Sequence, residues 1–274
     1  MTESFEATGN VMANVELVHW NPWRPQRVSF GKYRTFKFRV SNFGDLLGPL
    51  LVKKLLAEQG ICRKAATTKR RLLTVGSVML LARNGDTVWG TGVNGKSLQA
   101  EYKFTELDIR AVRGPLTADF LRKRGLDVPD VYGDPGLLVS HIAPRRHLPL
   151  PKKPSSVVYM PNMHDAPKWT HLPGCLSPQM PLKRIAASIA NAELVIASSL
   201  HAIVLADSYG IPSQLVRSQE EPMFKYEDYF LGTGRTDWRV ADTPEHARRL
   251  GGEEPTTWDS KPLLAAFPVD LWQT

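Results

Sequence analysis

The segment from Glu193 to Val216 contains the side chains whose order best suits chemistry. An apolar run ends at Ser198 and Ser199, and Leu200 and His201 then open a helical pattern. Backbone N–H groups and the positive end of a helix dipole bind anions at such a junction, and two hydroxyls add donors. A histidine there can give or take a proton beside the anion. A helix cap followed by a surface histidine explains the segment equally well.

Two arginines precede another predicted helix start. Arg113 lies directly before Gly114 and Pro115, and Arg110 lies three residues earlier. A guanidinium at a strand end can hold a phosphate or carboxylate through two hydrogen bonds. We interpret Arg113 as a candidate anion clamp, whereas a surface salt bridge explains Arg110 better.

Two shorter motifs combine turn residues with an acidic side chain. Asn42, Gly44 and Asp45 form a turn that leads into a helix, where an acidic group in the first turn is favourable. Asp134 begins an Asp-Pro-Gly turn. Helix capping and tight turns explain both motifs without any functional role.

Other candidates are glycine-rich turns and a basic, aromatic loop. Gly76, Ser77 and Asn94 lie in turns that let the backbone approach a ligand closely, but their spacing matches neither a dinucleotide fingerprint nor a P-loop. Lys225 and Arg235 lie among aromatic residues in MFKYEDYFLGTGR. That loop is either a substrate-binding element or an amphipathic packing edge.

The elements that must position these residues alternate between short apolar runs and helical patterns. We predict buried strands or strand-to-helix turns at Leu72–Leu81, Asp86–Val93, Leu107–Gly114 and Asp130–Val139. Helical patterns occupy 43–60 and 115–125, and the alternation resumes from residue 156. This pattern predicts an α/β architecture with parallel sheets.

A proline-rich, basic segment, Ser140–Ser156, interrupts the alternation and suits a spacer between domains. We predict an N-terminal α/β domain over 1–143, with residues 1–14 flexible, and a C-terminal α/β domain over 152–274. Two such Rossmann-like domains would face a cleft that binds ligand at the strand ends. The C-terminal segment is expected to pack back on the N-terminal domain.

The composition is that of a globular protein: 42% of the 274 residues are hydrophobic and 23% are charged. No apolar run approaches a membrane span, and the N-terminus does not resemble a secretory signal. Cys62 and Cys175 have no metal-ligand spacing and are predicted to be small core residues in a reducing compartment. We therefore expect a cytoplasmic protein.

The net charge of +8 fits nucleic acid, an anionic membrane surface or an anionic small substrate. The basic run Lys53–Arg71 has no interleaved aromatic residues and no nucleic-acid motif, so we expect no nucleic-acid partner. A solvated helix face explains the run best. The next interpretation is that the basic residues bind weakly to anionic lipid at the inner face of the plasma membrane.

Taken in order, NFGD, GS, WGTG, VRGP, YGDPGLL and SSLHAIVLADSYGIP resemble the polysaccharide pyruvyl transferase family. WGTGVNGK, FKYEDYFLGTGR and AAFPVDLW make the chain similar to the xanthan and succinoglycan ketal pyruvyltransferases. The resemblance runs from about Asn42 to Trp272. It implies a fold similar to GT-B glycosyltransferases, with the N-terminal domain on the acceptor side and the C-terminal domain on the donor side.

The resemblance also implies that phosphoenolpyruvate, not a nucleotide sugar, is the donor and that no metal or other cofactor is needed. Arg113 and His201 match positions implicated in donor binding and catalysis, and Asp45 matches a position near the cleft. Some members have arginine where this chain has Ser199, which leaves one phosphate contact to Lys225 or Arg235. Ala202 replaces a glycine found in many members.

The expected reaction transfers a pyruvyl group to two hydroxyls of a sugar in a bacterial exopolysaccharide or lipid-linked glycan precursor. Arg113 would clamp the donor, and His201 would act as acid or base or as a protonated phosphate ligand. Ser198 and Ser199 would add hydrogen bonds, and Asp45 would orient or deprotonate the acceptor. Further substrate-binding candidates are Asn42, Gly44, Gly76, Ser77, Asn94 and Leu200. Two alternatives remain open: a GT-B-type glycosyltransferase that uses a nucleotide sugar, and a non-catalytic binding module.

Overall fold

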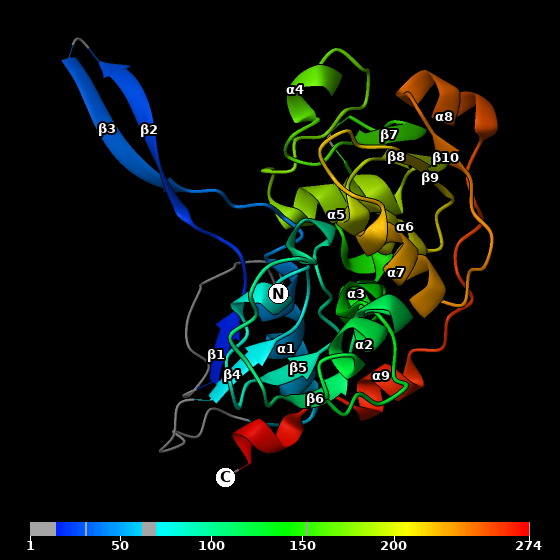
Figure 1. The fold of residues 1–274 in the computed structure, drawn as a ribbon. Helices are drawn as coiled ribbons and strands as arrows, with labels where there is room; N and C mark the ends of the chain where they lie inside the picture. Colours follow the sequence, from blue (N-terminus) through cyan, green and yellow to red (C-terminus); the bar gives the residue numbers. More distant parts are fainter. Residues whose placement is uncertain (1–14, 31, 62–69, 152, 274) are drawn as a thin grey trace.

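The computed structural model describes residues 15–30, 32–61, 70–151 and 153–273 (Figure 1). Residues 1–14, which were predicted to be flexible, lie outside the described residues, and so does Cys62. Residues 63–69 of the basic run are outside them too. Within the described ranges, none of the helices has the length and apolar character of a membrane span.

Four parallel strands form the sheet of the N-terminal half, in the order β1-β4-β5-β6. The strands are β1 (Val15–Val18), β4 (Arg70–Leu73), β5 (Thr87–Trp89) and β6 (Asp108–Ala111). The helices of this half are α1 (Leu47–Glu58), α2 (Pro115–Arg122) and α3 (Val139–Ile142), with 3-10 turns η1 (Met79–Leu81), η2 (Gly95–Ser97), η3 (Pro135–Leu138) and η4 (Arg145–His147). All three residues of β5 are buried, as expected of a central parallel strand.

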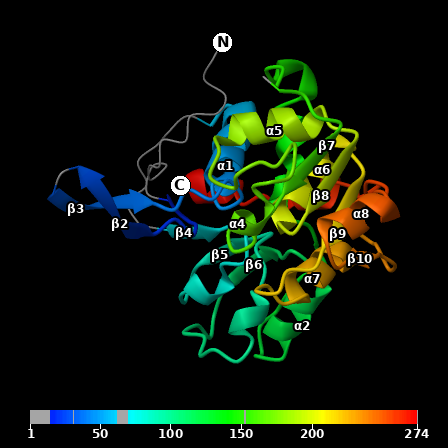
Figure 2. The ribbon, with the colours of Figure 1, turned by 90° about the horizontal axis from the view of Figure 1, so that it is seen from above.

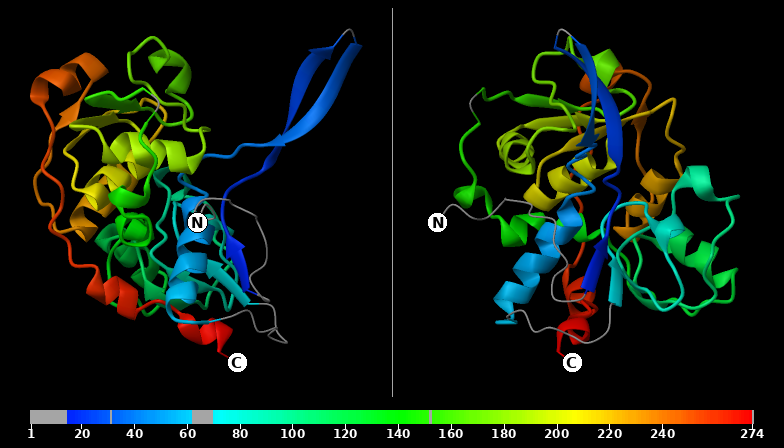
Figure 3. Two further views of the ribbon diagram at one scale, coloured as in Figure 1. Left: turned by 180° about the vertical axis from the view of Figure 1, so that it is seen from behind. Right: turned by 90° about the vertical axis from the view of Figure 1, so that its left-hand side faces the viewer.

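A β-hairpin extends from this half between β1 and α1. It consists of β2 (Trp23–Phe30) and β3 (Lys32–Arg39), which pair in antiparallel register. Figures 1 and 3 show the hairpin reaching away from the rest of the molecule. The hairpin is absent from the predicted elements, although the polar-apolar alternation of VSFGKYRTFKF around Gly31 is typical of one.

A second sheet of four parallel strands forms the C-terminal half, in the order β10-β9-β8-β7. The strands are β7 (Val157–Met160), β8 (Leu194–Ala197), β9 (Ser213–Val216) and β10 (Val240–Ala241). The helices are α4 (Ala166–Trp169), α5 (Leu182–Ala190), α6 (Leu200–Tyr209), α7 (Phe224–Gly232), α8 (Pro244–Leu250) and α9 (Lys261–Ala265), followed by the 3-10 turn η5 (Val269–Trp272). The predicted α/β architecture with parallel sheets is therefore confirmed, whereas the similarity to GT-B and the domain boundary stay predictions.

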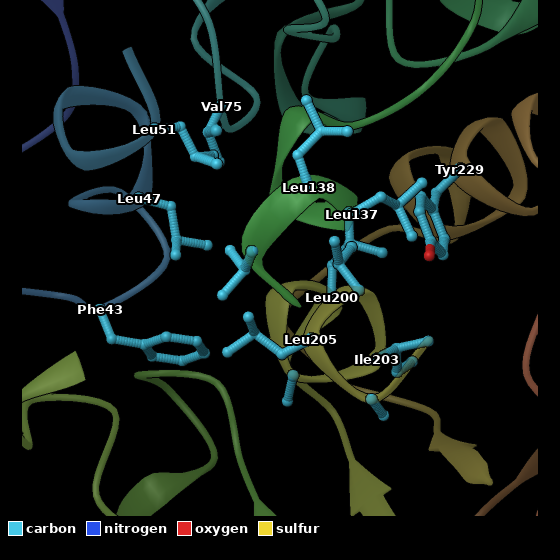
Figure 4. Packing of buried hydrophobic residues seen from close by; sticks show 14 of the residues in the cluster. Phe43, Leu47, Leu51, Val75, Leu137, Leu138, Leu200, Ile203, Leu205 and Tyr229 are labelled. Carbon is cyan, nitrogen blue, oxygen red and sulfur yellow. The ribbon is translucent and has the colours of Figure 1, made fainter. Parts of the chain in front are cut away.

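One hydrophobic cluster includes residues from both halves. Phe43, in the turn before α1, and Leu47, the first residue of α1, belong to the same cluster as Leu200 and Leu205 of α6 (Figure 4). Turn η3 contributes Leu137. Helix α6 is apolar almost all round because it packs against elements on several sides. The start of α6 is consequently held by contacts from both halves.

The C-terminal segment packs on the sheet of the N-terminal half. The indole Nε1 of Trp89 donates to the carbonyl oxygen of Leu263 at 2.9 Å, and the ring of Trp89 meets that of Phe267 edge to face at 5.0 Å. Arg110 forms ion pairs with Asp108 and Asp270. The chain thus returns to its first half after building the second, and Arg110 has the salt-bridge role preferred for it.

Two details differ from the sequence predictions. The segment Asp130–Val139 makes only an isolated bridge, between Tyr132 and Val112, before it turns into η3. Pro135 has no N–H to extend a strand ladder, and its fixed φ suits the first position of η3. Cys175 is partly buried beside a small apolar cluster and is not a fully buried core residue.

Candidate active site

A cavity of about 910 Å³ is lined by residues of both halves. Ser77 and Asn94 follow strands β4 and β5, and Asn162 and Ser199 follow β7 and β8, so the cavity lies at the carboxyl ends of both parallel sheets. Ligands bind at this edge in open α/β folds. The predicted site residues that line the cavity are Asn42, Asp45, Ser77, Asn94, Ser199, Leu200, His201 and Lys225.

His201 lies in the first turn of α6, with 13% of its side chain exposed. Its Nε2 is buried without a hydrogen bond, and the Oδ2 of Asp134, 4.0 Å away, is also buried without one. Burial, followed by the positive charges of Lys225 and Arg113, lowers the pKa of His201 to about 3. The imidazole of the ligand-free site is therefore neutral at physiological pH and can accept a proton.

Asp45 is the carboxyl group of the cavity that is suited to proton transfer near neutral pH. Asn42 Nδ2 donates to its Oδ2 at 2.9 Å. Burial raises the pKa of Asp45 to about 7, while the hydrogen bond from Asn42 and the charge of Lys225 oppose that rise. Gly76 has φ of 104°, a conformation that side-chain-bearing residues rarely adopt, and its turn packs against Asp45.

Two lysines from different halves share one carboxylate at the cavity. Lys225 Nζ lies 2.7 Å from Glu221 Oε2, and Lys96 Nζ lies 2.5 Å from Glu221 Oε1. His164 Nε2 lies 3.7 Å from the same carboxylate. Burial lowers the pKa of Lys225, and Glu221 opposes that shift. An anion in the cavity would meet two ammonium groups that Glu221 already holds in place.

Arg113 does not line the cavity, contrary to the direct contact with ligand that its position at a strand end predicts. Its side chain is fully buried, and its Nε and Nη2 lie 2.9 Å and 2.8 Å from Asp228 Oδ2. It also donates to Val93 O at 2.8 Å and to Ser77 Oγ at 2.6 Å. Asp228 belongs to α7, which lies beside α2 (Figure 2). In this arrangement Arg113 holds the loop of Ser77 to the second half.

Three other predicted site residues lie behind the cavity or away from it. Ser198 Oγ accepts from Asn162 N at 3.1 Å and so ties the ends of β8 and β7 together. Gly44 packs directly against the imidazole of His201. Arg235 pairs with Asp207 near the opposite end of α6 and does not line the cavity. Of the two residues predicted to contact phosphate, Lys225 lines the cavity and Arg235 does not.

The central part of the chain matches a known protein family. Residues 70–217, more than half of the chain, match the family model for polysaccharide pyruvyl transferase. The chain belongs to the polysaccharide pyruvyl transferase family. An uncharacterized protein of Acanthamoeba polyphaga mimivirus is 26% identical in an alignment of 188 residues that covers 64% of this chain and 64% of that protein. The chain thus spans less than two thirds of the length of that relative. No solved structure matches this chain.

Three side chains of this pyruvyl transferase family member, at or beside the cavity, were not predicted from the sequence to belong to the site. Asp134 was interpreted only as a turn residue, and Lys96 and Glu221 were not singled out. Asp134 is far from His201 in the sequence, and Lys96 is 125 residues from Glu221, so spacing carried no signal for these pairs. Glu221 does lie four residues before Lys225, at helical spacing. The motif YGDPGLL was the available signal for Asp134, because an aspartate before Pro-Gly is held rigidly by its turn. Within the described residues, no cluster of three or more His, Cys, Asp or Glu side chains could hold a metal ion.

Gly44→Ala is expected to lower turnover about 100-fold, because a Cβ on Gly44 would overlap the imidazole ring and displace His201. Turnover would be measured as phosphoenolpyruvate-dependent phosphate release. Gly60→Ala is the control: no atom lies within 4 Å of a Cβ there, and the strain from its φ of 67° lowers stability without displacing His201. Equal activity of the two variants would show that the position of His201 does not matter.

Proposed function

We propose that the chain transfers the pyruvyl group of phosphoenolpyruvate to two hydroxyls of a sugar, forming a ketal and releasing phosphate. Membership of the polysaccharide pyruvyl transferase family supports this reaction class. The observation that carries the proposal is a cavity where two lysines lie with a neutral histidine and a carboxyl group whose pKa is near 7.

The donor is an anion with a phosphate and a carboxylate, and the cavity offers matching cations. Lys96 and Lys225 line it, and their ammonium groups are within hydrogen-bonding distance of one carboxylate, Glu221. Ser199 and the start of α6 add donors where the helix dipole is positive. Arg113 supports this surface indirectly, through Ser77.

The chemistry needs one acid and one base. A proton added to the methylene carbon of phosphoenolpyruvate leaves C2 electron-poor, and a sugar hydroxyl attacks C2 while a base takes its proton. The C2–O bond to phosphate then breaks, and phosphate leaves with the proton that the base took. A second hydroxyl closes the ketal, and its proton returns to the group that protonated the carbon. Asp45, whose pKa burial raises to about 7, would supply the proton to carbon, and neutral His201 would accept the hydroxyl proton.

The acceptor in this proposal is a sugar of a bacterial exopolysaccharide or cell-surface glycan precursor, carried on a lipid. The reaction would take place in the cytoplasm, at the inner face of the plasma membrane. The net charge of +8 supports a peripheral contact with anionic lipid.

Phosphoenolpyruvate is expected to raise the melting temperature of the protein. At a hundredfold excess over its dissociation constant, a ligand that binds only the folded state stabilises it by about 2.7 kcal/mol. For a chain of this size that corresponds to roughly 5–10 °C. A thermal-shift titration measures the effect, and phosphate release with lipid-linked oligosaccharide fractions tests turnover.

The same titration separates this proposal from the rival transferase. A shift with nucleotide sugars and none with phosphoenolpyruvate would indicate a glycosyltransferase. Salt-sensitive binding to random DNA without phosphate release would indicate a binding module.

A further inference from the structure

Asp134 and His201 present to each other two buried polar atoms that have no hydrogen bond. Asp134 Oδ2 and His201 Nε2 lie 4.0 Å apart, and Asp134 is fully buried. Buried polar atoms are nearly always paired, and two that face each other are suited to pair together. A distance of 4.0 Å exceeds a hydrogen bond by about 1 Å, a gap of the size that closes when ligand binds to a catalytic site.

The other oxygen of Asp134 is already used, so only Oδ2 remains for His201. Gly136 N donates to Asp134 Oδ1 at 2.8 Å, and Pro135 begins the turn η3 directly after Asp134. Turn η3 packs against α6, the helix that carries His201, and Gly136 comes close to Val204 on that helix. This packing holds the Asp134 carboxylate beside the start of α6.

The pairing determines which ring nitrogen carries the proton. A carboxylate only accepts hydrogen bonds, so the Nε2 that faces it must be the N–H. Nδ1 then keeps its lone pair. Since Nε2 is buried, the exposed 13% of the His201 side chain comes from its other atoms, and His201 lines the cavity. The other charged groups that act on the ring, Lys225 and Arg113, are cations and oppose its protonation.

We propose that Asp134 is a positioning residue, which holds His201 as the tautomer with Nε2 protonated and leaves Nδ1 free to take a proton in the cavity. In the reaction proposed above, on which this last step rests, Nδ1 would accept the proton of a sugar hydroxyl. The carboxylate of Asp134 would stabilise the imidazolium that forms. The proton affinity of His201, which is low in the resting site, would therefore rise during the step.

The tautomer can be measured without any substrate. Long-range ¹H–¹⁵N spectra of the full chain with ¹⁵N-labelled histidine report which ring nitrogen is protonated. The chain has seven histidines, and the signal that disappears in His201→Asn is that of His201. We expect Nε2–H in the wild type, and a shift toward Nδ1–H in Asp134→Asn, whose amide can donate to Nε2. A wild-type Nδ1–H tautomer, or an unchanged tautomer in Asp134→Asn, would overturn the proposal.

Asp86→Asn is the matched control, because Asp86 is also a buried aspartate, bonded to Arg71 and Arg83 and outside the cavity. We expect Asp134→Asn to lose at least about 100-fold in kcat with little change in KM, and Asp86→Asn to keep both. Wild-type kcat in Asp134→Asn would overturn the proposal. If the wild-type protein releases no phosphate from phosphoenolpyruvate, the proposed function fails, while the tautomer spectrum still decides the role of Asp134.

Discussion

His201→Asn is expected to retain no more than about 1% of wild-type turnover. An asparagine can keep a hydrogen bond at the start of α6, but its amide cannot accept a proton from a hydroxyl. The wild-type imidazole is neutral because burial and nearby cations lower its pKa to about 3, so the form that accepts a proton is always present at neutral pH. Phosphate release under saturating donor measures the loss.

His141→Asn is the control for this prediction. His141 is more than half exposed, pairs with Glu58 and lies outside the cavity, so its replacement is expected to change turnover little. Equal melting temperatures of the two variants would separate catalysis from folding. Full activity of His201→Asn would remove the base role and leave His201 as a packing residue beside Phe43.

Arg113→Lys is expected to destabilise the fold by about 3 kcal/mol, although the charge is unchanged. An ammonium can reach Asp228 but cannot also satisfy Ser77 Oγ and Val93 O, which Arg113 contacts simultaneously. The residue is fully buried, so water cannot replace the lost bonds. For a chain of this size the loss corresponds to roughly 6–12 °C in melting temperature, measured by calorimetry.

Arg110→Lys provides the comparison for Arg113. The Arg110 side chain is 35% exposed and pairs with Asp108 and Asp270 at the surface, where such pairs contribute about 1 kcal/mol or less. If both lysine variants melt at the same temperature, the buried pair of Arg113 and Asp228 does not carry the stability assigned to it. If Arg113→Lys instead lowers the affinity for the donor and leaves the melting temperature unchanged, Arg113 contacts the donor directly.

The sequence predicted the parallel α/β architecture because that architecture depends on local patterns. Each buried strand is a short apolar run, and α2 has its proline in the first turn and Gly125 after its end, at φ 80°. The junction of Ser199 and His201 was predicted for the same reason. A strand that ends at serine before a helix is visible within about ten residues.

Pairs that are distant in the sequence could not be predicted. Arg113 was expected to face ligand, because an arginine at a strand end is ordinarily exposed, and its partner Asp228 is 115 residues away. Asp134 looked like a turn residue for the same reason: nothing near it in the sequence shows that its free oxygen faces His201. Burial and pairing of charged side chains depend on which helices pack together, and single-sequence patterns do not specify that.

The hydrophobic cluster shared by the two halves has a consequence for cooperativity. Because Phe43 and Leu47 belong to the same buried cluster as Leu200 and Leu205, neither half can unfold without exposing apolar surface of the other. Trp89 with Leu263 adds a second such link at the C-terminal end of the chain. Calorimetry should therefore record one transition with equal calorimetric and van't Hoff enthalpies, although the molecule has two sheets.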